Sequence, residues 1–307
     1  MLDLGKNPDA SRSAISEICA HTSQPFGVRV TRRSGLAPQS VPSQVDTVIV
    51  EQPSLAGDWR GRRVLVEITS VDEARSAAAR GASGIIAKGS ESGGRIGQAT
   101  TFVLLQQLVD QVPLPVWAMG GIGLHTASAC LVGGASGVVI DSQLALVQES
   151  SLPPDVKSAI SAMDGAETTM LAGYRVYTRP DLPVARMDRS IDPSGVSSRL
   201  GGSSLQELIA VGQEGAFAAD LAKRFKTAGG VVQALRRSIT SHMSSAVALR
   251  PLAPGSSFAA DHGIRYPIAQ GPMTRVSDRA DFAAAVASAG ALPFLALALM
   301  NAKDVRT

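Results

Sequence analysis

A repeated alternation of short apolar runs, rich in β-branched residues, with longer helical segments constrains this fold most. Such alternation is typical of βα units whose parallel strands are covered on both faces. Six runs predict strands: Phe26–Val30, Val45–Glu51, Val64–Ile68, Gly84–Lys88, Val116–Met119 and Gly137–Asp141. Helices are predicted over Val71–Gly81, Thr101–Gln111 and His125–Val132. Six βα units are two short of a closed eight-stranded barrel.

The chain changes character after residue 150, where Pro, Ser and Gly become frequent for about fifty residues and predict an irregular connection or lid. Helical spacing then returns over Ala216–Phe225 and Val231–Ile239, with Gly229 and Gly230 as a break between the two. A linker is expected over Leu252–Gly263.

A new βα pattern follows this linker, with strands predicted at Tyr266–Met273 and Leu292–Ala298 around a helix at Asp281–Ala289. We therefore predict a TIM (β/α)₈-type barrel with strands 3 to 8 in residues 26–142 and equivalents of strands 1 and 2 at the C-terminus. The expected division is residues 1–150 as a barrel incomplete at its N-terminus, 151–250 as an irregular and helical extension of the same domain, and 251–307 as a linker with the first two βα units of a second or permuted barrel.

Composition excludes several classes of protein. The chain is 45% hydrophobic and 18% charged, which supplies a large core and argues against disorder. Its net charge of +3 comes from scattered Lys and Arg without a basic stripe, so a nucleic-acid partner is not expected. No apolar run is long enough for a membrane span, and two cysteines without a CxxC pattern suit a reducing cytoplasm. The four isolated histidines give no metal-ligand spacing, so no metal site is predicted.

The first of three glycine-rich loops, Lys88–Gly97, follows a predicted strand at the end where barrel enzymes build their sites. Its paired glycines, Gly93 and Gly94, would let the backbone approach a planar ligand, with Glu91 and Arg95 as nearby charges. A tight surface turn explains two glycines equally well.

The second and third loops follow the strands expected to be the seventh and eighth. Met119–Gly123 lies between a strand and a helix, so its exposed amides suit a phosphate. Gly133–Ser142 ends the next strand with Asp141 and Ser142. A phosphate site after strands 7 and 8 is common in such barrels.

These segments, from EITSVDEARSAAARG through GSESGGRIG and WAMGGIG to GGASGVVIDS, resemble the second half of a nitronate monooxygenase (2-nitropropane dioxygenase) barrel, a family of FMN enzymes that includes flavin-dependent enoyl-ACP reductases. The resemblance covers roughly residues 62–145, and VGQEGAFAADL at Val211–Leu221 is similar to the family's C-terminal flavin-side segment. It implies an FMN site made by Lys88, Glu91, Gly93, Gly94, Gly120, Gly121, Ile122, Asp141, Ser142 and Gln213.

Gln270, Gly271, Pro272 and Met273 match the family's first-strand flavin motif, yet this motif lies near the C-terminus here. Two explanations fit: a circular permutation, or tandem barrels of which the chain holds the end of one and the start of the next. Because tandem barrels of this kind occur in very large polyketide-synthase-like proteins, the resemblance favours the second and implies other synthase domains as partners.

Arg95 is the most consequential departure, because the family has a histidine there as its acid/base. Arginine does not exchange protons near neutral pH. The resemblance implies an FMN-dependent oxidoreductase, cytoplasmic, acting on a small-molecule or acyl-carrier-bound substrate, with Arg95 in the place of the catalytic residue. The alternative is a catalytically impaired structural or docking barrel. A third possibility, an IMP dehydrogenase-type barrel, would need a loop cysteine, whereas Cys130 falls in a predicted helix.

Overall fold

The computed structural model describes residues 2–5, 7–59 and 61–300, and the chain divides into two compact units, residues 1–240 and 241–307. The boundary falls inside helix α8 (Ala228–Leu249), ten residues before the expected end of the extension at residue 250. Each unit is therefore described by itself. No helix in the described part of the chain is long and apolar enough to cross a membrane.

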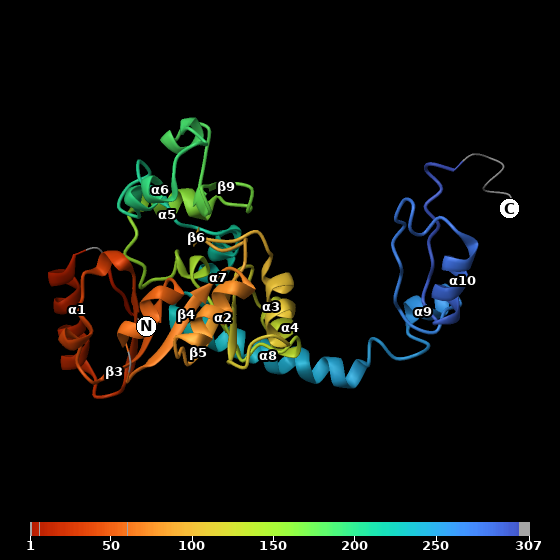
Figure 1. Ribbon diagram of the computed structural model, residues 1–307, viewed down its shortest axis with the longest axis horizontal. Helices are drawn as coiled ribbons and strands as arrows, with labels where there is room; N and C mark the ends of the chain where they lie inside the picture. The colour runs from red at the N-terminus through yellow and green to blue at the C-terminus, as the bar shows by residue number, and fades with distance from the viewer. Residues whose placement is uncertain (1, 6, 60, 301–307) are drawn as a thin grey trace. The chain divides into compact units, whose positions relative to one another are not determined.

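The first unit is built on a seven-stranded sheet in which all neighbouring strands are parallel (Figure 1). Its strands, in spatial order, are β1 (Leu2–Asp3), β2 (Phe26–Val30), β3 (Val45–Val50), β4 (Arg63–Ile68), β5 (Gly84–Lys88), β7 (Val116–Met119) and β8 (Gly137–Val139). All six predicted strands form.

β1 is an additional strand that the sequence reading missed, because two residues are too few to show a strand pattern. In the described residues β1 and β8 each pair on one side only, so the sheet is open and has seven strands, not the eight of a closed barrel. All five residues of β5 are buried, because the strand is covered on both faces. Its sequence is therefore almost continuously apolar instead of alternating between apolar and polar residues.

Helices α2 (Val71–Ala79), α3 (Thr101–Val109) and α4 (Thr126–Val132) follow one another beside the sheet (Figure 1). α2 contacts β4 and β5, α3 contacts β5 and β7, and α4 contacts β8. Ala74 and Ala77 of α2 are fully buried. Their small side chains let the helix approach the strands closely. Cys130 is buried within α4.

The N-terminal part of this unit adds α1 (Pro8–His21), whose first turn is capped by the Asn7 side chain, and three short 3₁₀ helices. These are η1 (Arg32–Ser34), η2 (Pro38–Ser40) and η3 (Pro53–Trp59).

The segment after β8 is more ordered than the sequence predicted. It forms η4 (Ser142–Leu144), α5 (Pro154–Ser161), β9 (Thr168–Leu171), β10 (Tyr174–Tyr177), η5 (Pro183–Arg186), α6 (Pro193–Arg199), β11 (Leu200–Gly201), β12 (Leu208–Ile209), η6 (Gln213–Phe217) and α7 (Ala218–Phe225). Buried side chains of α5, the β9–β10 hairpin, η5, α6 and β12 form a hydrophobic cluster separate from the main core beside the sheet, whereas Leu221 of α7 belongs to the main core.

The hairpin of β9 and β10 joins β6 (Gly94–Arg95) in a three-stranded antiparallel sheet, with Tyr174 opposite Arg95. Its turn residues Ala172 and Gly173 have φ values of 44° and 80°. Two consecutive positive φ angles are typical of hairpin turns that prefer Asn-Gly or Asp-Gly. Because alanine stands where Asn or Asp is usual, the sequence does not show this hairpin turn. The prediction of an irregular segment is therefore wrong here.

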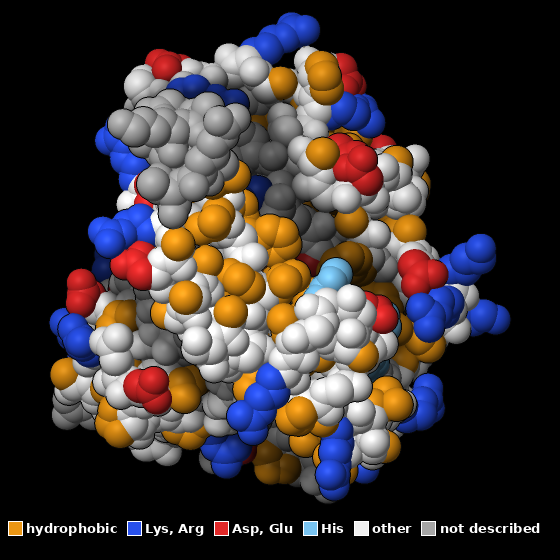
Figure 2. All heavy atoms as spheres, turned by 90° about the vertical axis from the view of Figure 1, so that its right-hand side faces the viewer, with side chains coloured by type: hydrophobic (Ala, Val, Ile, Leu, Met, Phe, Trp, Pro, Cys, Tyr) orange, Lys and Arg blue, Asp and Glu red, His pale blue; other side chains and the backbone are white. Residues whose placement is uncertain are grey.

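The second unit contains α9 (Ser257–Asp261), within the segment expected to be a linker, and α10 (Ala280–Ser288), the helix expected at Asp281–Ala289. The prediction of strands at Tyr266–Met273 and Leu292–Ala298 is wrong: within the described residues these segments form no strand and are joined by an isolated parallel bridge between Ala269 and Leu292. The unit exposes several large hydrophobic residues, and Figure 2 shows hydrophobic side chains gathered on one face of the molecule among Lys and Arg.

Candidate cofactor-binding site

A cavity of about 470 Å³ lies at the carboxyl ends of the parallel strands of the first unit. Strands β2 to β5, β7 and β8 all contribute lining residues at this end, and β6 and Tyr174 of the hairpin complete the wall. The volume is within the usual range for small-molecule sites. Two larger hollows, of about 620 and 610 Å³, lie at the amino ends of β3 and β4 and beside α1, where parallel sheets rarely build sites.

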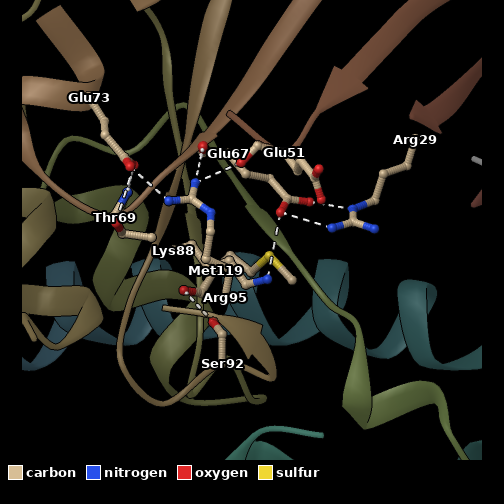
Figure 3. A network of polar contacts seen from close by, with 9 residues as sticks. All are labelled: Arg29, Glu51, Glu67, Thr69, Glu73, Lys88, Ser92, Arg95 and Met119. Atoms are coloured by element: carbon tan, nitrogen blue, oxygen red, sulfur yellow. Dashed lines mark hydrogen bonds and ion pairs between the residues drawn. The ribbon is translucent and has the colours of Figure 1, made fainter. Parts of the chain in front are cut away.

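Glu67, at the end of β4, is the centre of a buried charge cluster in the cavity wall (Figure 3). Its carboxylate accepts from Arg29 Nε at 2.5 Å and Arg29 Nη2 at 3.1 Å, and Lys88 Nζ lies 3.6 Å away. Burial alone would raise the pKa of Glu67, but the charges of Lys88, Arg29 and Arg95 outweigh it and lower the pKa to about 2. Glu67 is therefore ionised at every physiological pH.

Arg95 crosses the ends of two strands and ties them to α2 (Figure 3). Its Nη1 donates to Glu73 Oε1 at 2.7 Å, and its Nη2 donates to the carbonyl oxygens of Glu51 at 2.6 Å and Glu67 at 3.1 Å. The Nε atom is buried without a hydrogen-bond partner among the described residues. The guanidinium is thus a clamp on the strand ends as well as part of the cavity wall.

Gly93 and Gly94 line the cavity, and both need to be glycine. A Cβ built on Gly93 would lie 2.6 Å from the carbonyl oxygen of Ala210, and Gly94 has a φ of 76°. Lys88 also lines the cavity as the last residue of β5, with 4% of the residue exposed.

Glu91 is not placed as predicted. Its carboxylate accepts from the backbone nitrogen and Oγ1 of Thr101, at 3.0 and 3.1 Å, and so caps the N-terminus of α3. Its side chain does not line the cavity. A carboxylate ten residues before a helix start can serve as its cap, which local sequence patterns do not reveal.

The Gly120–Gly121 turn lies directly after Met119, a cavity residue, but neither glycine lines the cavity. The φ angles are 116° and 61°, and a Cβ on Gly120 would lie 2.6 Å from Thr101 Oγ1 and 2.7 Å from Ser92 Oγ. Ile122 is buried, and its carbonyl oxygen accepts from Gln143 Nε2 at 2.8 Å. The loop therefore packs tightly behind the cavity.

Residues of the third loop divide between the cavity and its surroundings. Asp141 lines the cavity, whereas Ser142 is buried and its Oγ accepts from the Gly212 nitrogen at 3.0 Å. Gln213 is exposed, and its backbone nitrogen donates to the carbonyl oxygen of Glu91 at 2.8 Å. β7 and β8 are parallel neighbours, so the second and third loops lie at the same end of the sheet, as expected.

Glu214, which the sequence reading passed over, lies in η6 with 2% of the residue exposed. Burial is the largest influence and raises the pKa of Glu214, and the negative charge of Asp141 raises it further. The backbone amides of Glu214 and Gly121 and the charge of Lys88 lower the pKa, but by less, so that it lies at about 7. Its Oε2 has no hydrogen-bond partner among the described residues. A buried carboxyl is therefore influenced by the backbone of Gly121, one of the two glycines that the resemblance assigns to the phosphate.

The Gln270–Met273 motif lies in the second unit. The Gln270 nitrogen donates to the Leu292 carbonyl oxygen at 2.9 Å, and its Oε1 accepts from the Phe294 nitrogen at 3.1 Å. The Met273 nitrogen donates to Ser277 Oγ at 2.7 Å. The motif thus holds the two predicted strand segments together within its own unit, and its role toward a cofactor remains a prediction.

Residues 50–177 match the family model of nitronate monooxygenase. This part of the chain is similar to the nitronate monooxygenase family. The matched segment runs from the end of β3 to the end of β10 and includes Glu67, Lys88, Arg95 and the Gly120–Gly121 turn. The resemblance drawn from the glycine-rich loops is therefore confirmed.

A relative from Rhodococcus jostii, named (3aS,4S,5R,7aS)-5-hydroxy-7a-methyl-1-oxo-octahydro-1H-indene-4-carboxyl-CoA dehydrogenase, is 32% identical over 169 residues, which are 52% of this chain and 48% of the relative. This chain thus spans about half the length of the relative. Such relatives and the family itself are oxidoreductases by name.

Solved structures support the fold. FabK from Thermotoga maritima superposes with a TM-score of 0.67 and 25% identity, over 78% of this chain and 83% of that chain. Nitroalkane oxidase from Streptomyces ansochromogenes gives a TM-score of 0.61 at 20% identity, over 80% and 89% of the two chains. The likeness therefore extends beyond the matched residues into the segment after β10.

Proposed function

We propose that this chain is part of an FMN-dependent oxidoreductase of the nitronate monooxygenase and enoyl reductase type. The supporting observation is the cavity at the carboxyl strand ends, whose wall includes Glu67, Lys88 and Arg95 from the segment that matches the family model. In parallel α/β barrels this end of the sheet carries the active site. A bound flavin would supply the redox chemistry, and the protein would orient it and set its electrostatic surroundings.

The residues present fit such a cofactor. The cavity is large enough for a planar ring, and the backbone at Gly93 and Gly94 forms part of its wall without side chains. Lys88 would place a buried positive charge beside the ring. The Gly121 amide, in the turn behind the cavity directly after Met119, would bind the phosphate once the Glu214 carboxyl releases it. Asp141 would contact the part of the cofactor between them. In the second unit, Gln270 and Met273 keep the family's first-strand pattern.

The substrate we propose is a small molecule or an acyl group carried as a thioester. The Rhodococcus relative acts on a CoA thioester, according to its name. Arg29, Arg33, Lys88 and Arg95 in the cavity wall would suit an anionic or strongly polarised substrate group. A cytoplasmic location and other domains of a polyketide or fatty-acid synthase as partners belong to the same proposal.

Flavin binding tests the proposal directly. FMN is titrated into the purified 307-residue chain, and quenching of flavin fluorescence together with a shift of its visible absorbance is expected. Ala210→Trp, which fills the cavity beside Gly94, should abolish the quenching, whereas Ala129→Trp on the exposed side of α4 should leave it unchanged. Absence of FMN binding by the unaltered, folded chain would overturn the proposal.

A second candidate function is a structural or docking barrel without catalysis, and Arg95 favours it. Its guanidinium is already held by Glu73 and by two strand-end carbonyl groups, so it serves the architecture where the family has an acid/base. Arg95→His separates the two candidates by assays of nitronate oxidation and NAD(P)H-dependent enoyl reduction. Activity that appears only in Arg95→His supports the structural role, and activity in the unaltered chain excludes it.

A further inference from the structure

The carboxyl group of Glu214 is built into the loop behind the cavity. η6 begins at Gln213, and the Glu214 side chain folds back over Gly212: a Cβ built on Gly212 would lie 2.3 Å from Glu214 Oε2 and 2.4 Å from Oε1. Only glycine at 212 leaves room for this arrangement. The carboxyl is therefore a defined occupant of this space, held by the backbone around it.

Glu214 faces the Gly120–Gly121 turn. The Gly121 amide favours the ionised form of its carboxylate and so lowers its pKa, while Oε2 stays buried without a partner among the described residues. An unpaired buried oxygen of a charged carboxylate is unfavourable, and a protonated carboxyl in the same place has a donor to offer a ligand. The arrangement has the form of an anion site whose anion is a side chain of the protein.

The charged groups around Glu214 do not neutralise it. Asp141, after β8, opposes its ionisation, and Lys88 on β5 favours it. Arg175 on β10 interacts with both Glu214 and Glu91. Burial outweighs the influences that favour ionisation, so the pKa of Glu214 rises to about 7 and both protonation states are populated near neutrality.

We propose that the Glu214 carboxyl must carry a proton before a phosphate group can bind at the Gly121 amide, so that binding of a phosphomonoester cofactor takes up one proton. The proposal rests on the proposed function for the identity of the ligand as FMN. A carboxylate and a phosphate cannot share one amide in a buried site, because their like charges repel. The protonated carboxyl releases the amide and donates its O–H, on the oxygen that now lacks a partner, to a phosphate oxygen.

The sign of the effect follows from linkage. Below pH 7 the Glu214 carboxyl is protonated and FMN affinity is at its maximum. Above pH 7 Glu214 must take up a proton from solvent before each phosphate can bind. Kd is therefore expected to rise about tenfold between pH 6 and pH 8 through this one group. The phosphate of free FMN has its own ionisation near pH 6, and a variant without the carboxylate separates the two effects.

The experiment measures FMN and riboflavin affinities of the 307-residue chain at pH 6, 7 and 8, for the unaltered protein and for Glu214→Gln. Glutamine keeps the shape of the protonated acid, and circular dichroism checks that the variant is folded. FMN affinity of the unaltered protein should fall with pH, while Glu214→Gln should bind FMN at pH 8 at least as tightly as the unaltered protein does at pH 6. Riboflavin, which lacks phosphate, should show no such fall.

Calorimetry supplies a measurement that needs no variant. FMN titrations at pH 7.5 in buffers of different ionisation enthalpy should show net proton uptake, and riboflavin titrations should show none. FMN binding with equal pH dependence in the unaltered protein and in Glu214→Gln, or without proton uptake, overturns this inference and leaves the proposed function standing. No FMN binding at any pH overturns the proposed function instead.

Discussion

Arg95 and Glu73 form an ion pair, with Nη1 and Oε1 2.7 Å apart, that joins β6 to α2. Glu73 also accepts from the backbone nitrogen of Thr69 at 2.8 Å, so the pair fixes the turn between β4 and α2. The same arginine reaches the carbonyl oxygen of Glu51 at the end of β3. One side chain thus holds three strand ends that shape the cavity.

Arg95→Ala is expected to lower the free energy of unfolding by about 2 kcal/mol, because hydrogen bonds to charged groups contribute about 1.5–3 kcal/mol and this pair is partly exposed. Urea unfolding followed by circular dichroism measures the change. Arg12→Ala is the matched control, since Arg12 pairs with Asp9 within the same helix and both side chains are largely exposed. It should cost less than about 0.5 kcal/mol. Equal losses in the two variants would contradict the clamp.

Glu67→Gln should destabilise the chain far more than an exposed substitution of the same kind. The change leaves Arg29, Lys88 and Arg95 near a neutral amide, and breaking a buried ion pair costs about 3–5 kcal/mol. Asp181→Asn breaks an exposed pair with Arg179 and should leave stability almost unchanged. The comparison uses the urea midpoints and m-values of the two variants. If Glu67→Gln were as stable as Asp181→Asn, the positive charges around position 67 would not need the Glu67 carboxylate for stability, which would contradict the prediction.

Acid should weaken the chain through Glu67. Its pKa falls from 4.5 to about 2 on folding, so its contribution is fully present above pH 4.5 and is lost as the pH falls through 2. The shift corresponds to about 3 kcal/mol at ~1.4 kcal/mol per unit. Unfolding free energies from pH 5 to pH 2 should therefore fall more steeply in the unaltered protein than in Glu67→Gln. Parallel curves would mean that other carboxylates cause the acid lability.

The strands that carry the site could be predicted because buried parallel strands leave continuous apolar runs, as in Gly84–Lys88. The glycine-rich loops then followed, since strand ends of one sheet meet at one edge. Glu67 was missed although a single acidic residue in an otherwise apolar strand was visible. Its cations, Arg29 and Arg95, lie 38 residues before and 28 residues after it, and no local pattern pairs them.

The role of Glu214 could not be predicted for a related reason. A Gly-Gln-Glu-Gly segment is typical of an exposed turn, and only the fold shows that the turn closes over the Gly121 amide. For Glu91 the sequence suggested a ligand contact, because the carboxylate lies beside a glycine pair. In the structure this carboxylate accepts from the Thr101 nitrogen and caps the start of α3.

Gly120→Ala tests how far the fold depends on the turn behind the cavity. A φ of 116° disfavours any L side chain, and the added Cβ would lie 2.6 Å from Thr101 Oγ1 and 2.7 Å from Ser92 Oγ. The expected loss is about 2–3 kcal/mol, from backbone strain of about 1–3 kcal/mol together with the steric overlap. Gly229→Ala, in the first turn of α8 with nothing within 4 Å, should instead gain about 0.5–1 kcal/mol. Thermal unfolding of both variants measures the contrast, and a Gly120→Ala protein as stable as Gly229→Ala would mean that the loop rearranges freely and does not fix the Gly121 amide in place.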